Sequence, residues 1–127
     1  MSRVCRVGGQ LLLIDIVAPE EPALAERYNR FERLRDTTHT TALAPTALTT
    51  LVSDAGFAVV REFHRDVEMD LQNWLDFTQA EPQVRVTIER AIQEELHGGT
   101  ATGMRPYVSD GRLKFLHLWW VIIGRKG

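Results

Sequence analysis

The sequence predicts an α/β fold, and the hydrophobic pattern carries this prediction. Apolar or β-branched runs typical of strands occur at residues 10–17, 57–63 and 112–125. Between these runs, apolar residues recur every three or four positions, as they do in amphipathic helices. The resulting order is strand, helix, helix, strand, two helices, strand, which is typical of an α/β protein. With 127 residues, we expect one domain over residues 1–127.

The first strand and the helix after it are marked by clear boundaries. Residues 10–17 (QLLLIDIV) follow a pair of glycines and are almost continuously apolar, which predicts a strand buried on both faces of a sheet. A helix is expected from about residue 20 to residue 34, because Pro22 falls in its first turn, where proline is tolerated. One face of this helix is apolar and consists of Leu24, Tyr28, Phe31 and Leu34.

The middle of the chain alternates between polar and apolar segments. Residues 35–45 (RDTTHTTALAP) are polar and are expected to form a loop. Pro45 then begins a second helix, and Gly56 is expected to end it in a left-handed conformation. The Val and Phe content of residues 57–63 predicts the next strand.

The last part of the sequence predicts two helices and a long strand. Asp70 is a plausible N-cap for a short helix. A longer helix is expected to start near Pro82, with apolar residues at every fourth position, and to stop at Gly98. After a loop, the aromatic and β-branched residues 112–125 predict a strand of more than about ten residues.

Composition and charge exclude several classes of function. The formal net charge is -2, and no cluster of Lys and Arg suggests binding to nucleic acid. The longest apolar run, Leu118 to Ile123, is far shorter than the roughly 20 residues of a membrane helix, and we identify no signal peptide. Cys5 is the only cysteine, and no His or carboxylate pair has metal-site spacing, so no metal is expected. We therefore expect a cytoplasmic protein.

Three segments, in the same order, resemble the UbiE-like branch of class I S-adenosylmethionine-dependent methyltransferases. Residues 3–9 (RVCRVGG) precede the first strand as R-V-L-K-P-G-G does in that family. Residues 34–39 (LRDTTH) match the family's R-D-P-S-H at Arg35, Asp36 and His39, ahead of a helix that ends in A-G-F. Thr41 departs from the pattern, because many relatives have Arg there. The chain also closes, as relatives do, on a long apolar strand and a basic residue.

The resemblance implies a partial Rossmann-like methyltransferase sheet of three strands flanked by helices. The last strand is expected to be antiparallel and central, so that the strand order is first, last, middle. The family binds S-adenosylmethionine on a Gly-rich E/D-x-G-x-G-x-G turn that this sequence does not contain. We therefore expect no cofactor-binding residue here and no cofactor bound by this chain alone. Residues 70–98 are expected to form a helical lid within the substrate-side, C-terminal half of the enzyme.

Candidate site residues follow from position and chemistry. Asp36 and His39 lie in the loop that would cover the acceptor, where an imidazole suits proton transfer. Alternatively, Asp36 caps local amides and His39 packs in a turn. Asp15 ends a strand, where open α/β sheets bind ligands. Trp74 could line an acceptor pocket or pack in the core, and His117 is interpreted as a hydrogen-bonded residue of the last strand rather than a ligand.

The first strand has no expected neighbour on its outer side, and the functional alternatives depend on what pairs there. An unpaired apolar edge favours association with another strand. We expect either a homodimer through residues 10–17 or pairing with a separate N-terminal half. The chain would then be part of a methyltransferase that acts on a small-molecule acceptor and is inactive alone. The alternatives are a non-catalytic self-association or partner-binding module, and a truncated product or fragment of a normal enzyme.

Overall fold

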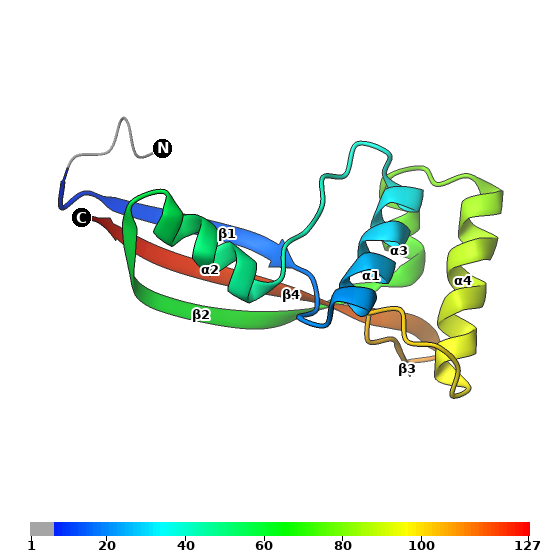
Figure 1. Ribbon diagram of the computed structural model, residues 1–127. Coiled ribbons are helices and arrows are strands. Elements are labelled where there is room, and N and C mark those ends of the chain that lie inside the picture. The colour runs from blue at the N-terminus through cyan, green and yellow to red at the C-terminus, as the bar shows by residue number, and fades with distance from the viewer. Residues whose placement is uncertain (1–6) are drawn as a thin grey trace.

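A computed structural model describes residues 7–127, so residues 3–6 of the first family motif, including Cys5, lie outside the described residues. The elements are connected as Figure 1 shows. In chain order they are β1 (Gln10–Val17), α1 (Pro22–Arg35), α2 (Pro45–Asp54), β2 (Phe57–Asp70), α3 (Leu71–Phe77), α4 (Pro82–Leu96), β3 (Tyr107–Ser109) and β4 (Arg112–Lys126).

The three long strands are arranged as the resemblance implied. Their order is β1-β4-β2, and β4 is central and antiparallel to both neighbours. The short strand β3 also pairs with β4, so the sheet has four strands rather than the predicted three. Three residues are too few to leave a recognisable hydrophobic pattern, which explains why β3 was not predicted.

Most predicted boundaries agree with the structure, and β2 is the main exception. The strand extends to Asp70, seven residues beyond the predicted end, and it pairs with β4 along its whole length. The side chains in its second half are mostly polar and exposed to solvent. This half therefore lacks the apolar pattern from which a strand is predicted. The predicted N-cap is confirmed, since the Asp70 carboxylate accepts a hydrogen bond from the Asn73 N–H at 3.0 Å.

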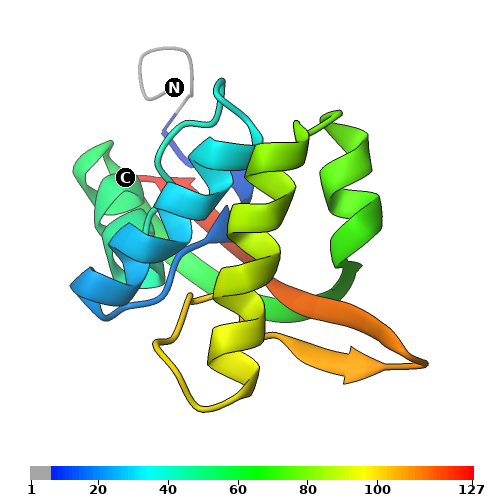
Figure 2. The ribbon, with the colours of Figure 1, turned by 90° about the vertical axis from the view of Figure 1, so that its right-hand side faces the viewer.

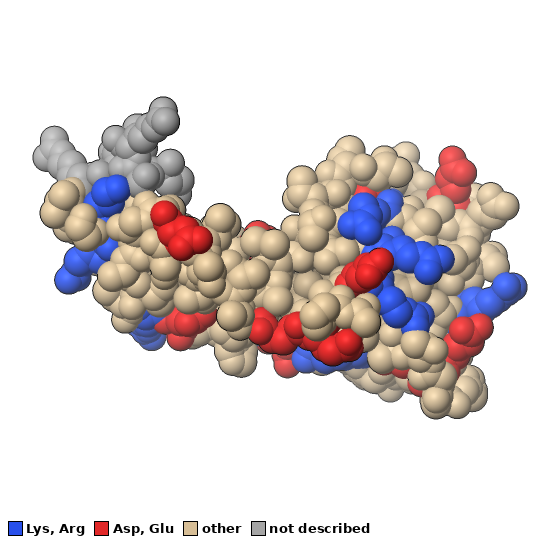
Figure 3. Space-filling view, viewed as in Figure 1, with Lys and Arg blue, Asp and Glu red and all other residues tan. Residues whose placement is uncertain are grey.

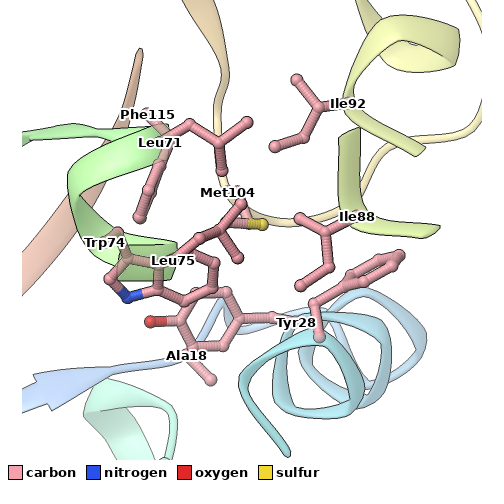
Figure 4. Close-up of a cluster of buried hydrophobic side chains, with 10 residues drawn as sticks. Ala18, Tyr28, Leu71, Trp74, Leu75, Ile88, Ile92, Met104 and Phe115 are labelled. Atoms are coloured by element: carbon pink, nitrogen blue, oxygen red, sulfur yellow. The ribbon is translucent and has the colours of Figure 1, made fainter. Parts of the chain in front are cut away.

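Two hydrophobic clusters divide the molecule into two regions. The helical part consists of α1, α3 and α4, which pack with the first half of β4 around Leu75, Ile88 and Phe115 (Figures 2 and 4). The sheet part consists of β1, α2 and the paired ends of β2 and β4, with a smaller cluster around Leu48 and Ile122. The molecule narrows between these regions, and the Lys and Arg side chains gather mainly on the helical part (Figure 3).

The prediction that β1 is buried on both faces is wrong. Helix α2 covers one face of the strand through Leu48 and Val52. On the opposite face Leu12 is 60% exposed and Ile14 is 53% exposed. Residues directly opposite in neighbouring strands share a face, so this exposed surface extends across β4 to β2. We call it the open face, and it consists of Leu12, Ile14, Phe63, Val121 and Ile123.

Candidate functional site

A buried acid and a buried imidazole meet where β4 passes beneath α1. Glu32 and His117 are each only 5% exposed, and Glu32 Oε1 lies 3.2 Å from His117 Nε2. The other carboxylate oxygen of Glu32 lies 3.4 Å from the Arg35 guanidinium. Burial by itself raises the pKa of Glu32, but the hydrogen bond and charge of His117 and the charge of Arg35 outweigh burial and hold it below its usual value.

Arg35 connects this acid to the aromatic core. Its guanidinium lies 4.2 Å from the centre of the Trp74 ring, and its Nη1 donates a hydrogen bond to the Trp74 carbonyl oxygen at 3.3 Å. Two buried donors, Arg35 Nε and Trp74 Nε1, have no hydrogen-bond partner among the described residues. Tyr28 lies beside Glu32, and burial, followed by the charge of that carboxylate, raises the pKa of the phenol.

A second polar contact links α1 to the loop that follows it. Asn29 is 4% exposed, and its amide Nδ2 donates to the carbonyl oxygens of Ala25 and Ala42 at 3.0 and 3.1 Å. Its amide Oδ1 accepts a hydrogen bond from the Ala42 N–H at 2.7 Å and lies 3.1 Å from His39 Nε2. The half-buried His39 is therefore held against α1 by the Asn29 side-chain amide, whose nitrogen and oxygen both have hydrogen-bond partners.

These groups surround two adjoining cavities. The first, of about 200 Å³, is polar and is lined by residues from β1, α1, β4 and the loop, among them Asp15, Glu32, His39 and His117. The second, of about 520 Å³, is mainly apolar and lies against α3, with Met69, Trp74, Phe77 and Trp119 in its lining. The two share Ile16, Arg35 and His117, so a polar and an apolar compartment meet at these three side chains.

The structure brings together only some of the predicted site residues. Asp15 and His39 both line the polar cavity. Asp36 does not, because its carboxylate accepts hydrogen bonds from the N–H and hydroxyl of Thr38 at 3.0 and 2.6 Å. These bonds to Thr38 lower the pKa of Asp36. Trp74 packs in the core of the helical part and also forms a wall of the apolar cavity.

Sequence reasoning missed Asn29 and Glu32, and it named Arg35 only as a motif match and not as a site residue. Tyr28, Glu32 and Arg35 are spaced by four and three residues, which places them on one side of a helix. Two charged residues on the core-facing side of a helix indicate a buried ion pair. The sequence therefore contained enough information to predict Glu32 and Arg35. Asn29 gave no such signal, since its role depends on a loop thirteen residues further along the chain.

Two classes of site are not found in the part of the chain that the structure describes. Over residues 7–127, no three His, Cys, Asp or Glu side chains are grouped so that they could hold a metal ion. Within the same range, each helix is too short or too polar to cross a membrane.

The fold of the chain matches solved structures. A crystal structure of a proposed methyltransferase from Bacillus halodurans C-125 (BH2331) superposes with a TM-score of 0.84 and 26% identity, over 98% of this chain and 59% of that one. The YcgJ protein from Bacillus subtilis superposes with a TM-score of 0.79 and 20% identity, over 98% of this chain and 54% of that one. No protein-family model and no curated protein match the sequence.

These comparisons define the class of the protein by its architecture. The chain has a methyltransferase fold, built from an open antiparallel sheet and flanking helices. It spans between half and three-fifths of the length of the two structures that it matches.

Proposed function

We propose that this chain is the acceptor-side part of an S-adenosylmethionine-dependent methyltransferase of the UbiE-like class. The observation that carries the proposal is the likeness to BH2331, which covers nearly all of this chain at a TM-score of 0.84. Fold alone does not define function, so the proposal also depends on the two cavities between β1, α1 and β4. They lie at the carboxyl end of β1, where open α/β sheets bind ligands.

In this proposal the two cavities hold a small acceptor with a polar group and an apolar body. The polar group enters the compartment lined by Asp15 and His39, and the apolar body packs against Trp119 and Phe77. Small-molecule sites commonly combine an apolar lining with a few polar groups that fix orientation. Asp36 is left out of the proposed site, because Thr38 engages its carboxylate.

The methyl donor is proposed to be bound by a separate or preceding polypeptide segment. The printed sequence has no Gly-rich cofactor turn, and the matched structures are considerably longer than this chain. Such a segment would place a strand beside β1 and cover the open face, whose exposed apolar side chains lie next to the proposed acceptor site.

Calorimetric titration of the purified chain with S-adenosylhomocysteine tests whether the cofactor is bound by another segment rather than by this chain. We expect no heat of binding up to millimolar ligand, because none of the family's cofactor residues is in the sequence. Clear one-to-one binding would contradict this proposal and would assign the cofactor site to this chain. Titration with S-adenosylmethionine serves as the matched control, since both ligands use the same site.

Self-association is a second candidate function, favoured by the outer edge of β1. The Ile16 N–H donates to the Asp15 carboxylate at 2.8 Å, so this amide is not used in the ladder with β4. Amides two and four residues earlier in a strand point the same way, which places those of Ile14 and Leu12 on the free edge. A second copy could pair there about a two-fold axis, as edge strands tend to do.

Light scattering at micromolar concentration tests the second candidate. A dimer that the substitution Ile14→Lys converts to a monomer would support pairing through β1. Val86→Lys is the matched control, because Val86 on α4 is exposed to nearly the same extent as Ile14 (54% against 53%) and lies outside the open face. A wild-type monomer would contradict self-association and leave the edge free for the cofactor-binding segment.

A further inference from the structure

The hydrogen bonds of Asn29 determine which nitrogen of His39 carries a proton. The Asn29 amide cannot be reversed, since one end faces the Ala42 N–H and the other faces two carbonyl oxygens. The atom that contacts His39 Nε2 at 3.1 Å is therefore the amide oxygen, which only accepts hydrogen bonds. His39 Nε2 must donate, so the neutral ring carries its proton on Nε2 and its lone pair on Nδ1.

We infer that His39 acts as a general base through Nδ1 and that Asn29 is its positioning residue. His39 lines the polar cavity, and Nδ1 makes no hydrogen bond to the residues 7–127 that the structure describes. Its role resembles that of other catalytic imidazoles, in which a partner on one nitrogen orients the other nitrogen toward the substrate. This inference rests on the proposed function for the acceptor, whereas the tautomer depends only on the contacts around Asn29.

The inferred step suits an acceptor with an ionisable O–H group beside an apolar or aromatic body. The hydroxyl proton passes to His39 Nδ1, and the oxygen uses its electron pair to form the new bond to the methyl carbon. The electrons of the broken carbon–sulfur bond stay on the sulfur of the sulfonium donor, which becomes a neutral thioether. His39 is left as an imidazolium and returns the proton to water. A carbon acceptor without such a proton has no use for this base.

The tautomer is tested by ¹⁵N-detected NMR of the histidine rings in the wild-type protein. We expect the neutral His39 ring to carry its proton on Nε2. In Asn29→Asp the carboxylate still accepts from Nε2 but no longer donates to Ala25 and Ala42, so the tautomer should persist in a less stable loop. A proton on Nδ1 of the wild-type ring would overturn the inference, and this readout does not depend on methyl transfer.

The base is tested with 4-nitrophenol, whose phenolate form absorbs visible light and whose neutral form does not. At a pH where the free probe is mostly neutral, we expect the wild-type protein to produce the phenolate band. His39→Gln should reduce the band at least about tenfold, in line with the loss of a general base. His97→Gln is the matched control, because His97 is exposed at the end of α4, and it should retain the band.

The outcomes separate this inference from the proposed function. The assignment of His39 as the general base would be overturned by either of two results. One is a wild-type protein that gives no phenolate band at millimolar 4-nitrophenol, and the other is a His39→Gln variant that keeps the band. Neither result would affect the fold or the site of cofactor binding. Conversely, one-to-one binding of S-adenosylhomocysteine would assign the cofactor site to this chain. A phenolate band that depends on His39 would still support His39 as the general base.

Discussion

The helical part and the sheet part of this molecule differ in how completely their apolar side chains are covered. In the helical part, α1, α3 and α4 enclose Phe115, Leu75 and Ile88, which have no exposed surface. In the sheet part, α2 covers only one face, and the open face leaves Leu12 and Ile14 more than half exposed. The first region is a complete core, whereas the second has the form of a sheet that another layer covers.

The open face is the surface on which we propose that a partner binds. Exposed apolar surface that adjoins a free strand edge is typical of an interface rather than of an ordinary solvated surface. The candidate site lies between the two regions, because Ile16 and His117 are contributed by the sheet and Arg35 by the helices. A partner that covers the open face would therefore lie next to the site, because Ile16 shares a face of β1 with Leu12 and Ile14.

The largest expected effect comes from comparing two phenylalanines on neighbouring strands. Phe115 has no exposed surface, and Phe63 on the open face is 45% exposed. Phe115→Ala should lower the free energy of unfolding by about 3–5 kcal/mol, because it leaves a cavity in a closed core. Phe63→Ala should cost about 1 kcal/mol or less, since little buried area is lost. Urea denaturation followed by circular dichroism measures both.

Equal losses from the two substitutions would contradict the division into a complete core and an open face. A large loss for Phe63→Ala alone would mean that the open face is covered in solution, for example by a second copy. Repeating the measurement at several protein concentrations distinguishes these cases, because the stability of a dimer depends on concentration.

A smaller effect is expected at the buried ion pair between the two regions. Glu32→Gln keeps the shape of the side chain but removes the charge opposite His117 and Arg35, and should cost about 1.5–3 kcal/mol. Because the folded pKa of Glu32 is below its ordinary 4.5, its contribution is fully present above that pH. The difference between wild type and variant should thus shrink as the pH falls below about 4.5 and through the folded pKa of Glu32.

Thermal unfolding of wild type and Glu32→Gln across this pH range checks the direction in which their stability difference changes. A difference that does not shrink below about pH 4.5 would contradict an ionised Glu32 in the folded protein. Glu89→Gln is a useful control, because Glu89 on α4 bonds to Gln72 and does not contact the buried pair.

The fold could be predicted well from the sequence because each element carries a local signal. Continuous or β-branched apolar runs marked the strands, and Asp70 and Gly56 marked helix boundaries that the structure confirms. The exposure of Leu12 and Ile14 could not be predicted, since an apolar strand gives the same pattern whether one face or both faces are covered. The described residues cover one face of this strand and leave the other exposed.

The candidate site was less predictable because it depends on contacts distant in sequence. Glu32 and His117 are 85 residues apart, and neither neighbourhood indicates the other. Asp15 and His39 were selected from position and resemblance, and the structure places both at one cavity. Asp36 and His39 were selected together because both match the family's R-D-P-S-H motif, yet the turn at Thr38 directs the two side chains to different partners.

The smallest expected effect separates those two neighbours. Asp36→Asn should leave the 4-nitrophenolate band at its wild-type level, because the Asp36 carboxylate contacts Thr38 and does not line the polar cavity. The substitution His39→Gln, three residues away, should reduce the band at least about tenfold. A loss of the band in Asp36→Asn without a change in melting temperature would show that the carboxylate acts on the acceptor or on His39. The site would then include both predicted residues, and the bonds to Thr38 would have to break when an acceptor binds.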